Sequence, residues 1–216
     1  MYVTDDGKTR LYIHIADVAR NVVPLYWWQN ESNGVTINWG DGSTEETFND
    51  TGDLNTTHTY ASTGDYVITL DVTSGTAKLG YGSSGYAVLG TTNNDNTVYR
   101  NMLRKVEIGN NMDLYSYAFY KCYSLKNITL THTTNSYAMQ AGLFQYCYSL
   151  NSIIIPDSVT SIESSAFDGC RSLSSITISD SVTSTGSNAF SSCYPLTSIT
   201  IPNSMTNIGT STFNSC

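Results

Sequence analysis

Apolar residues recur at a constant spacing through the second half of the chain. After each of Cys147, Cys170 and Cys193, a leucine follows at the third residue and isoleucines follow at the sixth and eighth residues. Apolar residues also occupy most of positions 12, 15 and 20, and small polar residues fill much of the rest. The cysteines lie 23 residues apart, and a constant period in the twenties is typical of a solenoid whose turns pack only on their neighbours.

Each repeat is expected to contain one short strand. A single residue separates the two isoleucines, and this period of two places both on the inner face of a strand. Pro156 and Pro202 follow directly and end the strand, because proline cannot donate to a sheet ladder. The residues at positions 12 and 15 begin the return path, and an alanine–phenylalanine pair such as Ala166-Phe167 closes the coil.

The cysteines mark the repeat boundaries. The repeats are 122–146, 147–169, 170–192 and 193–215. Residues 100–121 fit the pattern with Arg100 in the cysteine position, and we expect this segment to cap the stack, as terminal repeats do. Cys216 would open a further repeat, so the sequence predicts a truncation after residue 216, with more repeats in the whole protein.

The first part of the chain shows the alternation that is typical of β structure. Strands are predicted at residues 10–15, 35–39 and 65–72, where apolar residues occupy every second position. Residues 1–78 are therefore expected to form a β domain. Residues 79–99 are rich in glycine, serine and asparagine and are predicted to be a connector, which could include one last strand at residues 86–89.

The acidic residues concentrate in the first half. Residues 1–100 hold twelve Asp and Glu against five Lys and Arg, whereas residues 101–216 hold six against five. Because nucleic-acid binding needs Lys and Arg to neutralise phosphates, we expect no nucleic-acid partner. No run of about 18 apolar residues occurs, so no membrane span is expected in this segment, and its first residues are too polar for a secretory signal.

All five cysteines occupy the same repeat position: Cys122, Cys147, Cys170, Cys193 and Cys216. One interpretation is a ladder of buried free thiols that fill the same slot in successive turns. The alternative is disulfides between neighbouring turns, because strands about 4.8 Å apart bring equivalent residues within bridging range. The spacing of cysteine and histidine does not fit a zinc site.

No residues with the chemistry of catalysis occur in a recognisable arrangement. The three histidines stand at no triad-like or metal-ligand spacing: His14, His58 and His132. Asp41 in Gly-Asp-Gly is expected to cap its own turn, and calcium binding together with Asp53 or Asp65 is the weaker alternative. We therefore expect neither enzyme activity nor a cofactor.

One row of side chains is predicted to face outward. The position after the cysteine holds planar groups that would stack at the strand spacing: Tyr123, Tyr148, Arg171 and Tyr194. Tyr120, Tyr146 and Lys121 lie close to this row in the sequence. Tyrosine and arginine are favoured at interface hot spots, so the row is a candidate partner-binding surface. The alternative is that these side chains only cover the edge of the coil.

The repeat resembles a known family. Residues 155–173 read Ile-Pro-Asp-Ser-Val-Thr-Ser-Ile-x-x-x-Ala-Phe-x-x-Cys-x-Ser-Leu, which is similar to the BspA-type leucine-rich repeats of bacterial surface proteins, found also in some protozoa. Members of that family are described as cell-surface adhesins that bind host proteins. The resemblance therefore implies an extracellular or cell-surface location and a host or matrix protein as partner.

The first part of the chain resembles the PKD domain, an immunoglobulin-like β-sandwich common in extracellular proteins. The resemblance rests on three segments in this order: Trp39–Ser43, His58–Tyr60 and Gly64–Leu70. The chain departs from the family pattern between Trp39 and Gly-Asp-Gly, and in the inserted Trp27-Trp28 region. Such modules act as spacers or stalks, and the resemblance implies that role.

These observations predict a mainly β protein with an N-terminal immunoglobulin-like β-sandwich followed by a leucine-rich-repeat solenoid of 23-residue repeats. The leading function is a non-catalytic binding or adhesion module that recognises a protein. One alternative is a structural spacer, in which the tyrosines would be inert. Another is a carbohydrate-binding accessory region of a larger secreted protein, in which the tyrosines would stack on sugar rings.

Overall fold

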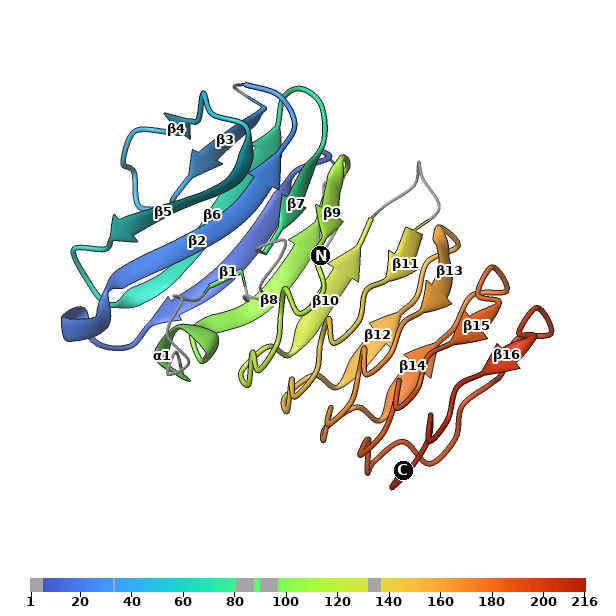
Figure 1. Cartoon of the computed structure of the whole chain (residues 1–216). Helices are drawn as coiled ribbons and strands as arrows, with labels where there is room; N and C mark the ends of the chain where they lie inside the picture. The colour runs from blue at the N-terminus through green and yellow to red at the C-terminus, as the bar shows by residue number, and fades with distance from the viewer. Residues whose placement is uncertain (1–5, 33, 81–87, 90–96, 132–136) are drawn as a thin grey trace.

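The computed structural model describes residues 6–32, 34–80, 88–89, 97–131 and 137–216. His132, most of the predicted connector and part of the predicted strand at residues 86–89 lie outside these ranges. The described chain is mainly β, as predicted, with a 3-10 helix η1 at Val18–Arg20 and a short helix α1 at Thr97–Arg100 (Figure 1). The strands before the repeats are β1 Thr9–Ile15, β2 Val22–Gln29, β3 Val35–Asn38, β4 Glu46–Thr47, β5 Gly52–Thr59, β6 Gly64–Val72 and β7 Ala77–Leu79.

Two sheets run from the N-terminal part into the first turn of the repeats, which contains β8 Leu103–Ile108 and β9 Met112–Leu114. One sheet begins with β10, Asn127–Leu130, and has the order β10-β8-β1-β6-β3-β4. The other has the order β5-β2-β7-β9. Leu11 of β1 pairs antiparallel with Val106 of β8, and Leu79 of β7 pairs in parallel with Leu114 of β9. A single cluster of buried apolar residues extends through both parts. The two separate domains stay a prediction, whereas the shared sheets and shared core are observed.

Three of the N-terminal strands lie where the alternation predicts them, at β1, β3 and β6. Two long strands have no such signal. Most residues of β5 are polar, so its sequence does not show the alternation of apolar and polar residues that predicts a strand. None of its side chains is fully buried. β2 contains Pro24, which a central strand excludes. Among the described residues, β7 pairs only with Trp27–Gln29, so no described strand lies along the edge of β2 beside Pro24.

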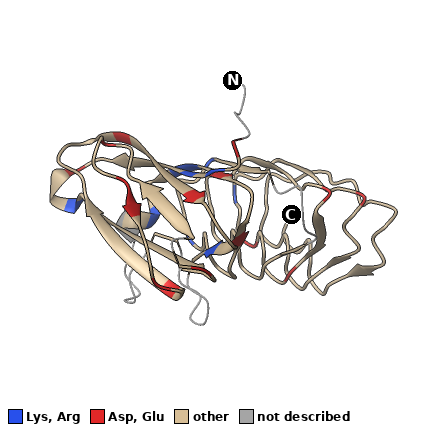
Figure 2. Ribbon diagram, turned by 90° about the horizontal axis from the view of Figure 1, so that it is seen from above, with Lys and Arg blue, Asp and Glu red and all other residues tan. Residues whose placement is uncertain are grey.

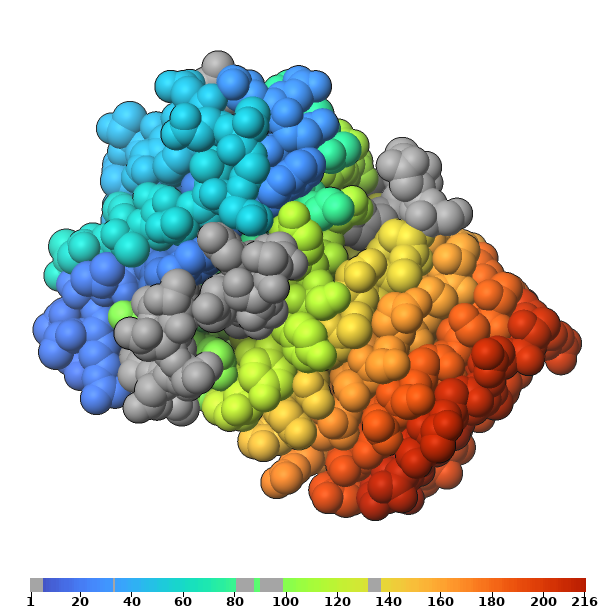
Figure 3. Space-filling view, in the orientation of Figure 1, coloured from blue at the N-terminus to red at the C-terminus, as the bar shows by residue number. Residues whose placement is uncertain are grey.

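The repeats form a solenoid of stacked coils, which confirms the prediction for this part of the chain. In Figure 3, successive turns of the solenoid form parallel bands on the surface. The strands after the cysteines are β10 Asn127–Leu130, β12 Ser152–Ile154 and β14 Ser175–Thr177. The strands of the return path are β11 Tyr137–Met139, β13 Val159–Ile162, β15 Ser184–Thr185 and β16 Asn207–Ile208.

A third side of the coil carries the most regular backbone hydrogen bonds. In each step from one turn to the next, the residues five, three and one before the cysteine donate their N–H groups to the following turn. Phe119, for example, donates to the carbonyl oxygen of Leu143 over 3.0 Å, and Phe144 donates to Ala166 over 2.8 Å. The phenylalanine rings of successive turns stack with centroid separations between 5.3 and 5.6 Å. This side therefore holds all the turns in one register.

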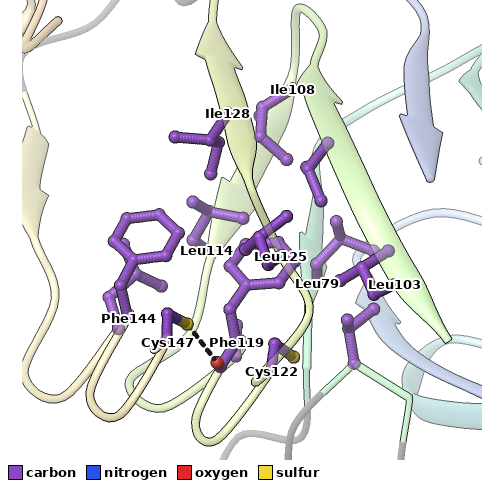
Figure 4. Packing of buried hydrophobic residues seen from close by; sticks show 14 of the residues in the cluster. Leu79, Leu103, Ile108, Leu114, Phe119, Cys122, Leu125, Ile128, Phe144 and Cys147 are labelled. Carbon is purple, nitrogen blue, oxygen red and sulfur yellow. Dashed lines mark hydrogen bonds between the residues drawn. The ribbon is translucent and has the colours of Figure 1, made fainter. Parts of the chain in front are cut away.

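The cysteines lie behind this side as free thiols, which rules out the disulfides between turns. Four of the five thiols are buried, and Cys216 is exposed. The thiol of Cys147 donates to the carbonyl oxygen of Phe119 over 3.1 Å (Figure 4). Burial raises the pKa of the Cys122 and Cys193 thiols to about 12, so they stay protonated and serve as packing groups.

Burial decreases toward the C-terminal turn. Ile153 and Ile155 are buried, and Ile154 between them is 72% exposed, as a period of two requires. In the last repeat, Ile199 is only partly buried and Ile201 is 38% exposed, and no strand forms around them. The prediction of a strand with two inward isoleucines is therefore wrong for residues 193–215, because the last turn has a described neighbour on one side only.

Candidate binding surface

The row of planar groups, Tyr123, Tyr148, Arg171 and Tyr194, follows a left-handed turn in each repeat. The residue before each cysteine has a positive φ, for example 59° at Lys121, 61° at Tyr146 and 73° at Gly169. This reversal connects the hydrogen-bonded side to the strand side. As a result the cysteine points into the core and the next side chain points to the surface. We call the four side chains the tyrosine–arginine row.

Three members of the row form a continuous stack. The rings of Tyr123 and Tyr148 lie 4.9 Å apart at an interplanar angle of 25°. The guanidinium carbon of Arg171 lies 4.7 Å from the centroid of the Tyr148 ring, a cation–π distance. Both separations match the spacing of neighbouring strands, about 4.8 Å. Each planar group therefore packs on the next without any distortion of the coil.

Exposure increases along the row. Tyr123 and Tyr148 are partly buried, since neighbouring groups cover part of each ring, whereas Arg171 is exposed and Tyr194 is 57% exposed. Asp180 is the only charged residue after Arg171 in the whole sequence. In Figure 2 the ribbon at this end of the solenoid is almost entirely tan, the colour of uncharged residues. The row thus presents aromatic and cationic groups on a neutral, polar background.

Tyr120 and Tyr146 form a second aromatic line beside the row. Their rings lie 5.8 Å apart, and the ring of Tyr146 lies 6.3 Å from that of Tyr148. Lys121 and Arg100 both lie over the Tyr120 ring, at 5.0 and 5.5 Å from its centroid. Arg100 therefore fills the first cysteine position with a cation that packs on Tyr120, near the end of the same segment 100–121. Burial raises the pKa of the Tyr146 phenol.

Tyr146 also has a structural role. Its ring covers Gly169 so closely that a Cβ atom on Gly169 would lie 2.4 Å from Cδ1 of Tyr146. Part of this second line therefore covers the edge of the coil, whereas the exposed faces of Arg171 and Tyr194 cover little of it. Tyr120, Tyr123, Tyr146 and Tyr148 are all partly buried, so the candidate residues with the most exposed surface are Arg171 and Tyr194.

A hollow of about 550 Å³ on the strand side was not predicted from the sequence. It is lined by residues of β8, β10 and β12, among them Lys105 and the exposed Ile154. It lies where the described residues of β10 and β12 share no backbone ladder, although β8 pairs with β10 and β12 pairs with β14. The one available signal is the length of repeat 122–146, which exceeds the regular period by two residues.

The motif residues of the N-terminal part meet in one cluster. The ring of His58 stacks on Trp39 at 4.7 Å, and the phenol of Tyr60 donates to the carbonyl oxygen of Trp39 over 2.9 Å. Asp41 receives the backbone N–H of Ser43 on Oδ1, at 3.0 Å, and lies 2.7 Å from Nε2 of His58 through Oδ2. Both oxygens of Asp41 therefore have protein partners, one of which caps the turn.

The other carboxylates of the calcium alternative have their own surroundings. Asp65 pairs with Nδ1 of His14 over 2.7 Å, and Asp53 lies opposite Trp28 in β5. Within the described ranges, no three His, Cys, Asp or Glu residues come close enough together to hold a metal ion. The helices in those ranges also include none with the length and apolar character needed to cross a membrane.

The regular coil, with its column of phenylalanines and free cysteines, agrees with the comparison to protein families. A profile of the BspA type Leucine rich repeat region, which covers six copies, matches residues 91–141 and 137–216. Together these segments span residues 91–216, more than half of the chain. The chain belongs to the BspA type leucine-rich repeat family. This confirms the resemblance drawn from residues 155–173.

Solved structures similar to the chain include three bacterial proteins. A leucine-rich repeat protein from Eubacterium ventriosum ATCC 27560 is 23% identical, with a TM-score of 0.48 over 52% of this chain and 30% of that one. The T. pallidum Leucine Rich Repeat protein is 30% identical, with a TM-score of 0.44 over 53% and 49% of the two chains. A leucine rich cell surface protein from Faecalibacterium prausnitzii A2-165 is also 30% identical, with a TM-score of 0.40 over 53% and 37%. The chain thus spans less than half the length of each protein. None of the curated proteins matches it.

Proposed function

We propose that the chain is a non-catalytic binding module of a bacterial cell-surface or secreted protein, and that it recognises a protein partner through the tyrosine–arginine row. The observation that carries the proposal is the stack of Tyr123, Tyr148 and Arg171, with ring and cation separations of 4.9 and 4.7 Å. Groups that already pack on one another lose little conformational freedom on binding, so most of their contact energy remains available to a partner. The extracellular location rests on membership of the family.

We further propose that the N-terminal part is a PKD-like, immunoglobulin-like β-sandwich that presents the solenoid. The contacts among Trp39, His58 and Tyr60 support this, because they bring together the segments on which the resemblance rests. The pairing of β1 with β8 would then fix the direction of the row relative to the sandwich.

The test is a binding screen of the fragment against extracellular-matrix proteins and a glycan array. The variant carries Tyr123→Ala, Tyr148→Ala and Tyr194→Ala. A matched control replaces three threonines of one row on the return path, Thr160, Thr183 and Thr206, with alanine. Thermal unfolding of all three proteins shows whether each variant keeps its fold.

A protein ligand that binds the wild type and the threonine variant, and binds the tyrosine variant at least tenfold more weakly, is the expected result. Binding of a protein ligand that is equal in all three proteins would rule out the row. A hit on the glycan array alone, lost in the tyrosine variant, would make the chain a carbohydrate-binding accessory region. No binding on either array would favour a structural spacer.

A further inference from the structure

A second cavity lies at the other end of the molecule from the exposed part of the row. It has a volume of about 300 Å³ and lies between the end of β1, the helix η1 and the start of β8. Its walls are formed by His14, Ala16, Asp17, Arg20, Asn101, Met102 and Arg104. Two of the chain's five arginines therefore line one small cavity, in a protein with a net charge of −8.

Backbone hydrogen bonds fix the main chain at both arginines. Asp17 caps η1 by accepting the N–H of Ala19 over 2.9 Å, and the N–H of Arg20 donates to the carbonyl oxygen of Asp17 over 3.0 Å. Arg104 lies in β8, and its carbonyl oxygen accepts the N–H of Lys126 over 2.9 Å. The side chain of Arg104 donates one bond, from Nη1 to the carbonyl oxygen of Asn101 at 2.7 Å. Its remaining guanidinium donors are available to the cavity.

Neither arginine has an acidic partner among the residues that the structure describes. The ion pairs of the described residues use Lys8, Arg10, His14, His58 and Lys105, and none includes Arg20 or Arg104. The carboxylate of Asp17 lines the same cavity but caps η1, and Asp65 pairs with His14 at the cavity wall. Two arginines therefore line a common space, and no carboxylate of the described residues lies within salt-bridge distance of either one.

We propose that this cavity binds an oxyanion, namely a carboxylate, sulfate or phosphate group of a small ligand. Guanidinium groups donate paired N–H bonds that match the geometry of these anions, and such charge-assisted bonds are about twice as strong as neutral ones. The volume is sufficient for one such group and a few further atoms. The side-chain amide of Asn101 adds a possible neutral donor at the wall. This site is independent of the tyrosine–arginine row.

The test is a titration of the ¹⁵N-labelled fragment with sodium sulfate, sodium phosphate and sodium acetate, followed by amide NMR shifts. Sodium chloride at equal ionic strength serves as the reference. We expect saturable shifts at residues 14–20 and 101–104. Saturation by acetate alone would assign the site to a planar carboxylate, and saturation by sulfate and phosphate alone would assign it to a tetrahedral anion.

Matched variants distinguish binding at this cavity from nonspecific electrostatic attraction of anions to the protein. Arg20→Gln and Arg104→Gln should each weaken binding at least about tenfold, because each removes a charge-assisted contact. Arg10→Gln, which removes an arginine that pairs with Asp6 outside the cavity, should leave binding unchanged. Asp17→Asn keeps the cap of η1 and removes a negative charge that would repel the bound anion, so it should strengthen binding. The proposal is wrong if no saturable shift occurs below 50 mM of any of the three anions, or if the Arg20→Gln/Arg104→Gln double variant shows the wild-type response with its other amide peaks unmoved.

Discussion

The thiol of Cys170 donates a hydrogen bond to the backbone carbonyl oxygen of Phe144, which lies 3.2 Å away and 26 residues earlier in the chain. Cys170→Ala removes a fully buried sulfur atom and this contact, and we expect it to lower the free energy of unfolding by about 1–2 kcal/mol. Cys216→Ala changes an exposed residue and should stay within about 0.5 kcal/mol of the wild type. Urea unfolding followed by circular dichroism measures both. If Cys170→Ala lowers the free energy of unfolding as little as Cys216→Ala does, the buried cysteines do not stabilise the stack.

The pairing of Asp41 with His58 predicts an acid-dependent stability. Burial alone would raise the pKa of Asp41, but hydrogen bonds from Ser43 and His58 outweigh it and lower the pKa from 3.8 to about 2. A lowered pKa stabilises the fold above the ordinary value, and this contribution disappears as pH falls from about 4 to 2. Asp41→Asn should therefore have a lower Tm at pH 6 and a flatter Tm profile between pH 4 and 2. Asp65→Asn is the control, since the side chain of Asp65 is 86% exposed. If the Tm of Asp41→Asn falls between pH 4 and 2 as steeply as that of the wild type, the prediction is contradicted.

The contact between Tyr146 and Gly169 predicts a measurable coupling. Gly169→Ala places a Cβ atom against the Tyr146 ring at a residue with φ of +73°, and we expect a loss of about 1–3 kcal/mol in the free energy of unfolding. Gly42→Ala is the matched control, because Gly42 has φ of +86° with no atom within 4 Å of the added Cβ. Gly42→Ala should lose only the part of the free energy of unfolding that comes from placing alanine at a positive φ. In a Tyr146→Ala background, the cost of Gly169→Ala should fall to that of Gly42→Ala, and an unchanged cost would show that the ring moves aside freely.

The sheets shared by the two parts of the chain predict a single unfolding transition. All three tryptophans lie in residues 27–39, so their fluorescence reports on the N-terminal part, and labelling of Cys122 reports on the first full repeat. Because β1 pairs with β8 and β7 pairs with β9, both signals should change at the same urea concentration. The Cys216→Ala variant removes the exposed thiol from the experiment. Two separate midpoints would support independent domains.

The repeat could be predicted from the sequence because each of its contacts recurs. Position 0 is always cysteine after residue 121, and Phe167, Phe190 and Phe213 follow the same spacing, so the sequence shows the buried column directly. The stacking of Tyr123 on Tyr148 follows from the same period. Whether that stack binds a partner stays a prediction, since the period reports only which side chains are neighbours.

Other features have no local signal. The pairing of Leu11 with Val106 joins residues far apart in the chain, and an alternating pattern does not identify the partner of a strand. The left-handed turn before each cysteine is largely hidden as well, because Gly169 is the one glycine among the five residues that occupy it, and Lys121 and Tyr146 give no such signal. The cavity between Arg20 and Arg104 likewise depends on tertiary contacts between distant segments.

The position of β8 between β1 and β10 has a consequence for the order of folding. Each turn of a solenoid needs a formed neighbour to pair with, and the first turn here obtains it from β1 and β7, which precede it in the chain. The N-terminal part can thus act as a template before any repeat exists. Since synthesis also begins at that end, the stack can grow in one direction, one turn at a time, as the ribosome delivers it.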